Sequence, residues 1–143
     1  MAGRRHLESL DRGRCLELLR TVRVGRLVFT ENLLPTVQPV NFRIHRGQVV
    51  TRVAGGAKLS AATSGAVVAF QADELDPDLW TGWSVTVVGH ANLITDVGEL
   101  VELAGTFLQP WVDGRRDHFV RIGTEKVTGR RLHGPPRKDD CFP

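Results

Sequence analysis

The sequence predicts a mainly β protein of the α+β class: a six- to seven-stranded antiparallel split β-barrel with two or three peripheral helices. Three observations lead to this prediction. Short segments with alternating apolar residues recur along the chain, most of them follow one another directly, and helical periodicity is confined to a few short stretches. Strands that are neighbours in sequence favour an antiparallel barrel over a parallel sheet built from βαβ units.

A helix of about three turns is expected near the N-terminus. Asp11 has a side chain suited to the N-cap, and the apolar residues that follow recur at i, i+3, i+4 and i+7. These residues are Cys15, Leu18, Leu19 and Val22. Residues 1–10 precede this helix and are expected to form a flexible lead-in.

Three strands of an antiparallel meander follow the helix. They are expected at residues 26–30, 36–44 and 48–53. Pro39 lies inside the second strand, and a proline has no N–H to donate to a neighbouring strand. The second strand is therefore expected to have an edge or a bulge at this position.

The second half of the chain alternates strands with helical pieces. The expected elements are a helix at 59–63, strands at 66–72 and 83–94, a helix from 96 to about 108, and strands at 118–122 and 126–132. Asp96 and Glu99 have the spacing of a capping box for the longer helix. The acidic, proline-containing stretch 73–78 is expected to be a loop, and Gly89 a bulge or bend in the long strand.

A chain of 143 residues has the size of one domain. This domain is expected to span residues 11–133, because the tail 134–143 holds three prolines and four charges and is expected to be disordered. Cys15 and Cys141 have no paired spacing, which favours a reducing compartment. No apolar stretch has the length of a membrane span and no signal peptide is recognisable, so the protein is expected to be cytoplasmic, without a membrane partner.

The net charge of +3 is distributed unevenly. Residues 1–58 contain eleven Lys/Arg and four Asp/Glu, residues 59–114 contain eight Asp/Glu and no Lys/Arg, and residues 115–143 contain eight basic and four acidic residues. This asymmetry fits a basic site for a phosphate ligand, or charge pairing within one chain or across a dimer. Nucleic-acid binding is disfavoured, because the basic residues are scattered, tyrosine is absent and no recognition helix is visible.

Several catalytic and binding motifs are excluded. The chain has neither a glycine fingerprint for dinucleotides nor a P-loop, and Gly82-Trp83-Ser84 lacks the second glycine of a nucleophile elbow. The histidines do not have the spacing of metal ligands; they are His6, His45, His90, His118 and His133. No metal site is therefore predicted.

The segment Gly55-Gly56-Ala57-Lys58 carries the most specific functional signal. Two glycines allow backbone N–H groups to approach an anion, Lys58 adds a mobile positive charge, and the helix expected from Leu59 directs its partially positive end to the same place. The alternative is an ordinary strand-to-helix turn with a solvated lysine. The spacing alone leaves both interpretations open.

Four further residues could contact a ligand from the strands. Thr51 and Arg52 alternate to opposite faces of the strand before the loop, so one of them could face the anion, and an arginine could hold it with two hydrogen bonds. Trp83 could pack against a planar ring, and Ser84 could form a hydrogen bond with it. The structural alternatives are a cross-strand threonine, a surface charge and a core tryptophan.

Taken together, several segments resemble the pyridoxamine 5′-phosphate oxidase-like proteins, in the same order from about Leu10 to Leu132. The first four are Val24-Gly25-Arg26-Leu27-Val28-Phe29, Pro39-Val40-Asn41-Phe42, Gly56-Ala57-Lys58-Leu59 and Thr81-Gly82-Trp83-Ser84-Val85. The C-terminal ones are Pro110-Trp111, residues 117–122 and Val127-Thr128-Gly129-Arg130. The chain is most similar to small members typical of actinobacteria that are related to nitroimidazole-reductase-like proteins.

The resemblance implies an FMN-binding split barrel that forms a homodimer, with two flavins at the subunit interface. It implies that Lys58 and Thr51 lie near the FMN phosphate. The residues implied to line the isoalloxazine ring are Pro39, Val40 and Asn41, joined by Trp83 and Ser84 from the long strand of the same or the partner subunit. The resemblance assigns no role to Arg52, which is a candidate because it lies on the strand that leads into the glycine loop.

The function implied by the resemblance is that of a flavoprotein oxidoreductase. A flavin would transfer hydride through N5 to a small-molecule acceptor such as a quinone or a nitro compound. The residues that bind pyridoxine phosphate in true oxidases are not recognisable, so vitamin B6 synthesis is not predicted. The alternatives are an F420-dependent reductase of the same fold and a non-catalytic protein that binds flavin or haem. No catalytic side chain is assigned.

Overall fold

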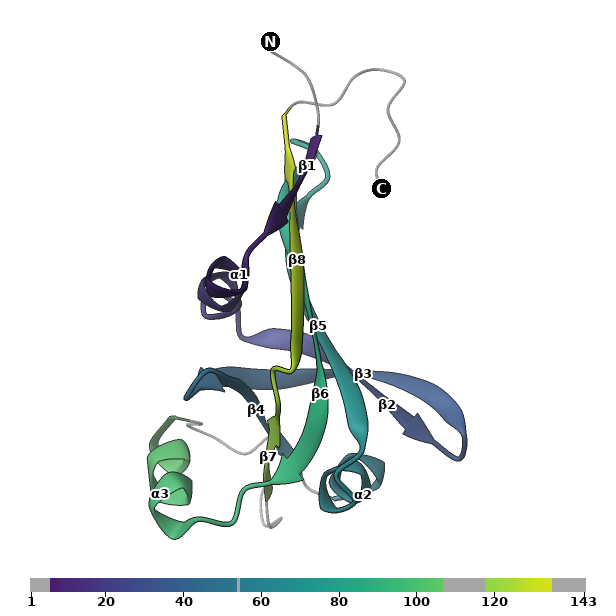
Figure 1. The fold of residues 1–143 in the computed structure, drawn as a ribbon, viewed down its shortest axis with the longest axis vertical. Helices are drawn as coiled ribbons and strands as arrows, with labels where there is room; N and C mark the ends of the chain where they lie inside the picture. Colours follow the sequence, from purple (N-terminus) through teal and green to yellow (C-terminus); the bar gives the residue numbers. More distant parts are fainter. Residues whose placement is uncertain (1–5, 54, 107–117, 135–143) are drawn as a thin grey trace.

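The computed structural model describes residues 6–53, 55–106 and 118–134. Its centre is a six-stranded antiparallel barrel (Figure 1). In order around the barrel, the strands are β2 (Val24–Glu31), β3 (Leu34–His45), β4 (Gln48–Val53), β7 (His118–Ile122), β6 (Thr81–Leu93) and β5 (Val67–Asp76). Strand β6 closes the barrel because it pairs with both β5 and β7. The predicted antiparallel barrel is confirmed.

Two strands lie outside the barrel. Strand β8 (Lys126–His133) pairs with β6, and β1 (His6–Leu10) pairs with β8 in turn. Residues 6–10 thus form a strand instead of the expected flexible lead-in, because β8 offers an edge of backbone hydrogen-bonding groups. Beyond the barrel, the ends of β5, β6 and β8 continue with β1 as an antiparallel sheet. We call this sheet the open ladder (residues 6–10, 73–76, 81–84 and 129–133).

The expectation of a loop at residues 73–78 is wrong for residues 73–76. Strand β5 continues to Asp76 in unbroken register with β6. The turn comes after it, and the Asp76 carboxylate accepts hydrogen bonds from the backbone N–H groups of Asp78 and Leu79 at 3.0 and 3.2 Å. Pairing with a complete neighbouring strand outweighs the low strand propensity of Asp and Glu.

The proline and the glycine singled out inside strands have different outcomes. Around Pro39, β3 pairs with β2 alone, because its pairing with β4 starts only at Phe42. The predicted edge is therefore confirmed. Gly89 is not a bulge, since the register with β5 runs through it without a break. Strand β6 pairs with β8 up to Val88 and with β7 from Ala91, so Gly89 lies where the pairing changes. A Cβ atom at Gly89 would collide with the Gly123 carbonyl oxygen.

Helix α1 (Arg12–Leu19) begins as predicted. The Asp11 side chain accepts a hydrogen bond from the backbone N–H of Arg14 at 2.8 Å, and the buried face packs against β6 and β8 through Cys15, Leu18 and Leu19. This close packing depends on Gly129 of β8, where a Cβ atom would lie 2.5 Å from the Cys15 sulfur. The thiol of Cys15 is buried, and burial raises its pKa.

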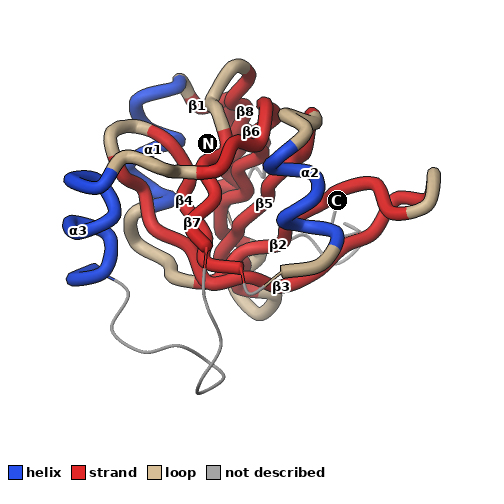
Figure 2. The backbone as a smooth tube through the Cα atoms, turned by 90° about the horizontal axis from the view of Figure 1, so that it is seen from below, coloured by secondary structure: helices blue, strands red, loops and turns tan. Residues whose placement is uncertain are grey.

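Two further helices cover the barrel. Helix α2 (Ala57–Thr63) lies across the end seen in Figure 2 and packs through the buried Ala62. Helix α3 (Val97–Thr106) covers β4 and β7, with Leu103 buried against Val50 and Phe119.

Three predictions concern segments outside the described residues. They are the end of α3 near residue 108, the Pro110-Trp111 segment, and residues 135–143 of the tail. No helix in the described ranges is long and apolar enough to cross a membrane.

Side chains on β3, β2, β5 and β6 divide between the barrel interior and an outer face. Burial alternates along these strands, and residues paired across strands share a face. The interior contains Phe42 and Phe70, whose ring centroids lie 4.6 Å apart. We define the outer face by the residues that point away from this interior: Val37, Pro39 and Asn41, then Val24, Arg26 and Val28, then Val67, Ala69, Gln71 and Asp73, then Ser84 and Thr86.

Candidate cofactor-binding site

The loop between β4 and α2 has the geometry of an anion cradle. Gly55 and Gly56 have φ values of +143° and +82°, which favour glycine strongly over other residues. No described atom lies within 4 Å of the position that a Cβ atom would take on either glycine. The backbone of the loop therefore borders open space, which is the requirement for a phosphate to approach its N–H groups.

Lys58 lies in the first turn of α2, directly after this loop. Its backbone position is consistent with the predicted role near a phosphate, while its side chain lies outside the described residues. The contact between the Lys58 ammonium group and an anion therefore stays a prediction.

Strand β4 sends Thr51 and Arg52 to opposite faces, as the alternation predicts. Thr51 is completely buried, and its hydroxyl donates a hydrogen bond to the Asn41 carbonyl oxygen at 2.8 Å. Arg52 is half-buried, with its guanidinium carbon 5.4 Å from the ring centroid of Phe119. The Thr51 hydroxyl thus joins β4 to β3, and Arg52 is the partly accessible member of the pair.

The three candidate residues on β3 also divide between the faces. The side chain of Val40 is buried in the core, opposite Gly25. Pro39 is exposed and Asn41 is half-buried, and both belong to the outer face. A planar ring lying over this strand would meet the Pro39 ring and the Asn41 amide, whereas Val40 could offer only backbone atoms.

A hydrogen-bonded network extends across the outer face from β2 to β6. The Gln71 amide nitrogen donates to Asp73 at 2.7 Å and to the Ser84 hydroxyl oxygen at 3.2 Å. Arg26 approaches the second oxygen of Asp73 at 3.5 Å. The network fixes the Gln71 amide and leaves the Ser84 hydroxyl hydrogen and the Gln71 carbonyl oxygen available as donor and acceptor for the edge of a planar ligand.

The candidate residues on β3 and β6 lie on one face but do not meet within one copy of the chain. The register runs from Pro39 through Arg26 and Gln71 to Thr86, which makes three strand-to-strand steps. At about 4.8 Å for each step, the separation is about 14 Å. Pro39 and Asn41 therefore lie far beyond hydrogen-bonding distance of Ser84.

Comparison with known proteins agrees with this architecture. The sequence profile described as pyridoxamine 5′-phosphate oxidase matches residues 11–131. The chain belongs to the pyridoxamine 5′-phosphate oxidase-like family. It is 42% identical over 133 residues to the Mycobacterium tuberculosis protein Rv0080, a match that spans 90% of this chain and 87% of that protein.

Solved structures of similar proteins include two that are described as FAD-binding. The FAD-binding protein from Mycobacterium smegmatis is 36% identical, with a TM-score of 0.76 over 88% of this chain and 98% of that one. An FAD-binding protein from Mesorhizobium loti has a TM-score of 0.75 over 91% of this chain and 99% of that one. At 23% identity, this second similarity concerns the fold alone.

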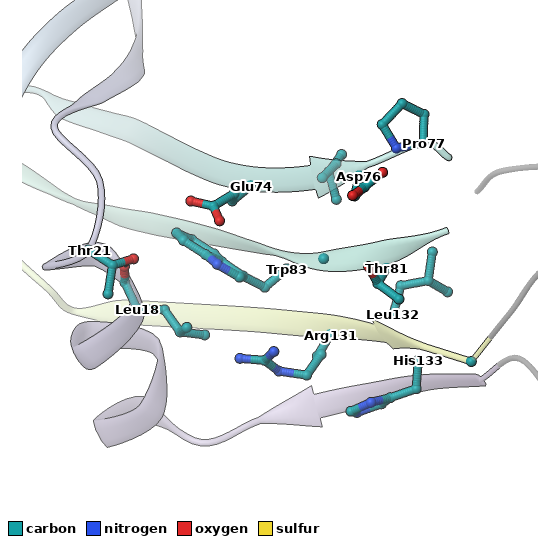
Figure 3. Close-up of a pocket in the computed structure, with 13 residues that line it drawn as sticks. Leu18, Thr21, Glu74, Asp76, Pro77, Thr81, Trp83, Arg131, Leu132 and His133 are labelled. Atoms are coloured by element: carbon teal, nitrogen blue, oxygen red, sulfur yellow. The ribbon is translucent and has the colours of Figure 1, made fainter. Parts of the chain in front are cut away.

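In this member of the pyridoxamine 5′-phosphate oxidase-like family, Trp83 is separated from the other candidate residues. Ser84 belongs to the outer face, so the side chain of Trp83 points to the opposite face of β6, toward α1. It lines a pocket of about 950 Å³ on the open ladder (Figure 3). None of the other sequence-predicted site residues is among the described residues that line this pocket.

The outer-face network has no motif in the sequence. Asp73 falls in the stretch that is predicted to be a loop, and Gln71 belongs to no motif. The available signal was the alternation of Phe70 and Ala72 with Gln71 and Asp73, which continues the strand and places the two polar side chains on one face.

Proposed function

We propose that the chain is a flavin-dependent oxidoreductase that binds FMN, with its phosphate at the loop before α2. The observation that supports this most strongly is the pair of glycines at Gly55 and Gly56, with positive φ values and open space in front of them. The family fold and the FAD bound by a relative that is 36% identical support the flavin as the ligand.

The same site suits FMN and the equivalent part of FAD. Both molecules contain the isoalloxazine ring, the ribityl chain and the first phosphate, which are the parts that the loop and the outer face would contact. FMN is the proposed form, because the anion cradle is a single short loop. F420 and haem are the competing cofactors.

Each part of the chain has a distinct role in this proposal. The loop N–H groups and Lys58 hold the phosphate, Arg52 adds positive charge nearby, and the Gln71–Ser84 pair orients the ring edge by hydrogen bonds. A bound flavin supplies the hydride chemistry. The chain contributes position and hydrogen bonds, and we assign no side chain as a proton donor.

We further propose that the flavin lies between two copies of the chain. Asn41 and Ser84 are about 14 Å apart across the sheet of one copy, and a two-fold arrangement would bring Asn41 toward the partner's Ser84. The outer face also exposes apolar side chains, since Val24, Val37 and Val67 are 49%, 62% and 59% exposed. An exposed apolar surface of this kind is typical of a protein–protein interface.

The proposal is tested by the visible spectrum of the purified protein and by titration with FMN, FAD, F420 and haem. Lys58→Ala is expected to weaken FMN binding by about 10- to 150-fold, the loss of one charge-assisted hydrogen bond. Lys138→Ala removes the same charge from the tail and is the matched control. Full FMN affinity in Lys58→Ala would remove Lys58 from the site, and a protein that binds none of the four cofactors would refute the function.

A further inference from the structure

The pocket on the open ladder forms a second place where side chains converge. It lies beneath the C-terminal end of α1, on the face of β5, β6 and β8 opposite the outer face, and its volume is about 950 Å³ (Figure 3). That volume is at the upper end of the range for small-molecule sites. Its lining residues are Leu18 and Thr21, Glu74 to Pro77, Thr81 to Trp83, and Arg131 to Gly134. We call it the Trp83 pocket.

Trp83 forms the buried wall of this pocket. Only 5% of the residue is exposed, yet its indole N–H has no hydrogen-bond acceptor among the described residues. Tryptophans that are largely buried normally have a partner for this group. The indole nitrogen of Trp83 is not among the fully buried polar atoms of the described residues that lack a partner, so it is accessible at the pocket wall. The indole N–H is therefore left for whatever occupies the pocket.

Arg131 is the second donor that lines the pocket. It lies directly opposite Trp83 in the β6–β8 register and is half-buried. Its guanidinium makes no hydrogen bond or ion pair within residues 6–53, 55–106 and 118–134. The acid across from it on β1, Glu8, pairs with His133 instead. A partly buried, unpaired guanidinium beside an unpaired indole N–H makes a site for an anionic acceptor such as a carboxylate.

The other side of the pocket sets a limit on the charge of the ligand. Glu74 lies opposite Trp83 on β5, two strand-to-strand steps and about 10 Å from Arg131. Figure 3 shows the indole between Glu74 and Arg131. The Glu74 and Asp76 carboxylates, both on the β5 side of the pocket, would repel a second negative charge, whereas Leu18 offers an apolar contact. These features favour a compact monoanion with an apolar or aromatic body.

We propose that the Trp83 pocket binds small aromatic monocarboxylates, with the carboxylate on Arg131 and the Trp83 indole N–H and the ring against Leu18. This site lies on the opposite face of the sheet from the proposed flavin contacts. Its occupancy is independent of the flavin, so the two proposals can fail separately.

The test uses the full-length, ¹⁵N-labelled protein and follows the indole N–H signals of its tryptophans by NMR. Trp83→Phe identifies the Trp83 signal and removes the donor. Indole-3-acetate is expected to shift this signal saturably, with a Kd on the order of 1 mM or tighter. Indole-3-acetamide, its neutral counterpart, is expected to bind at least about tenfold more weakly, because it cannot form the charged hydrogen bond to Arg131.

The matched variants are Arg131→Gln and Arg130→Gln. Both remove one positive charge from β8, but Arg130 points to the opposite face and does not line the pocket. Arg131→Gln is expected to weaken indole-3-acetate binding at least about tenfold, and Arg130→Gln to leave it unchanged. Glu74→Gln is expected to strengthen it, because a repulsive charge is removed.

Three results of the indole-3-acetate measurements would overturn the proposal. They are an unshifted Trp83 signal at about 10 mM indole-3-acetate, equal binding of the acetamide, and equal losses in the two arginine variants. FMN titration of Arg131→Gln separates this site from the flavin site. Retained FMN binding with lost indole-3-acetate binding supports two sites, whereas loss of both would show that the Trp83 pocket is part of the flavin site.

Discussion

The two ends of the molecule use charged side chains in opposite ways. At the α3 end, the carboxylate of Glu99 is 2% exposed and pairs with Arg46 at 3.0 Å and Arg121 at 3.1 Å. At the open ladder, which lies at the other end in Figure 1, Arg131 and the Trp83 indole have no partner among the described residues. The buried charge of Glu99 is paired within the fold. The polar groups of Arg131 and Trp83 line a pocket without a partner and are available to a ligand.

The ion pairs of Glu99 connect three separate parts of the chain. Glu99 belongs to α3, Arg46 to the turn after β3, and Arg121 to β7. Glu99 was predicted only as a capping-box residue, and half of that prediction is confirmed, because its backbone N–H donates to the Asp96 carboxylate at 2.9 Å. Its own carboxylate is bound by the two arginines and holds α3 against the barrel.

The largest effect on stability is expected from Glu99→Ala. This change removes the buried carboxylate that binds Arg46 and Arg121, and each hydrogen bond to a charged group contributes about 1.5–3 kcal/mol. Urea unfolding measures the loss of free energy. Glu102→Ala is the matched control on the same helix, because that carboxylate is 55% exposed and surface pairs contribute about 1 kcal/mol or less. Equal losses in the two variants would contradict the role assigned to burial.

A smaller loss is expected from Gly129→Ala, where α1 packs on the open ladder. The added Cβ atom would lie 2.5 Å from the Cys15 sulfur, and overpacking of this kind costs about 1–3 kcal/mol. Gly105→Ala in α3 is the control, since no described atom lies within 4 Å of its Cβ position. It should stabilise the protein by about 0.5–1 kcal/mol. Cys15→Ala should recover part of the loss in Gly129→Ala, and a strictly additive double variant would contradict the steric explanation.

Features that depend on neighbouring residues could be predicted from the sequence, whereas the pairing of distant strands could not. The N-cap at Asp11 and the edge at Pro39 depend on a few neighbouring residues, and both are confirmed. Strand β1 depends on β8, more than 100 residues away, with His6 opposite His133. No local pattern in residues 6–10 could reveal that pairing.

In the candidate site too, the face of each strand residue could be predicted, but contacts between strands could not. Alternation placed Thr51 and Arg52 on opposite faces, and the same rule separates Trp83 from Ser84, although the resemblance groups them. The sequence could not show that Thr51 is fully buried and bound to a carbonyl, because this depends on how β3 and β4 pair.

Arg131→Gln is expected to change stability hardly at all, which sharpens the contrast with the α3 end. An arginine without a partner gives the folded state no ion pair to lose, so the free energy of unfolding should stay within about 0.5 kcal/mol of the original. Arg121→Gln is the comparison, because it takes a partner away from the buried Glu99 and should destabilise the protein clearly. Urea unfolding of both variants measures the difference. A loss in Arg131→Gln as large as that in Arg121→Gln would show that Arg131 serves the fold.

The smallest effect concerns an exposed pair between the two ends. A hydrogen bond from the His90 ring, at 3.1 Å, lowers the pKa of the Glu125 carboxyl. A carboxyl whose pKa is lowered by folding stabilises the protein above its ordinary, unfolded pKa, and this contribution disappears as the pH falls through the lower, folded pKa. In an NMR titration, His90→Ala should raise the pKa of Glu125 toward its ordinary value.

The control for this prediction is His133→Ala. It removes a different histidine–glutamate pair, the one with Glu8 on the open ladder, and should leave the Glu125 pKa unchanged. If both variants moved it equally, net charge would explain the shift and the contact with His90 would not.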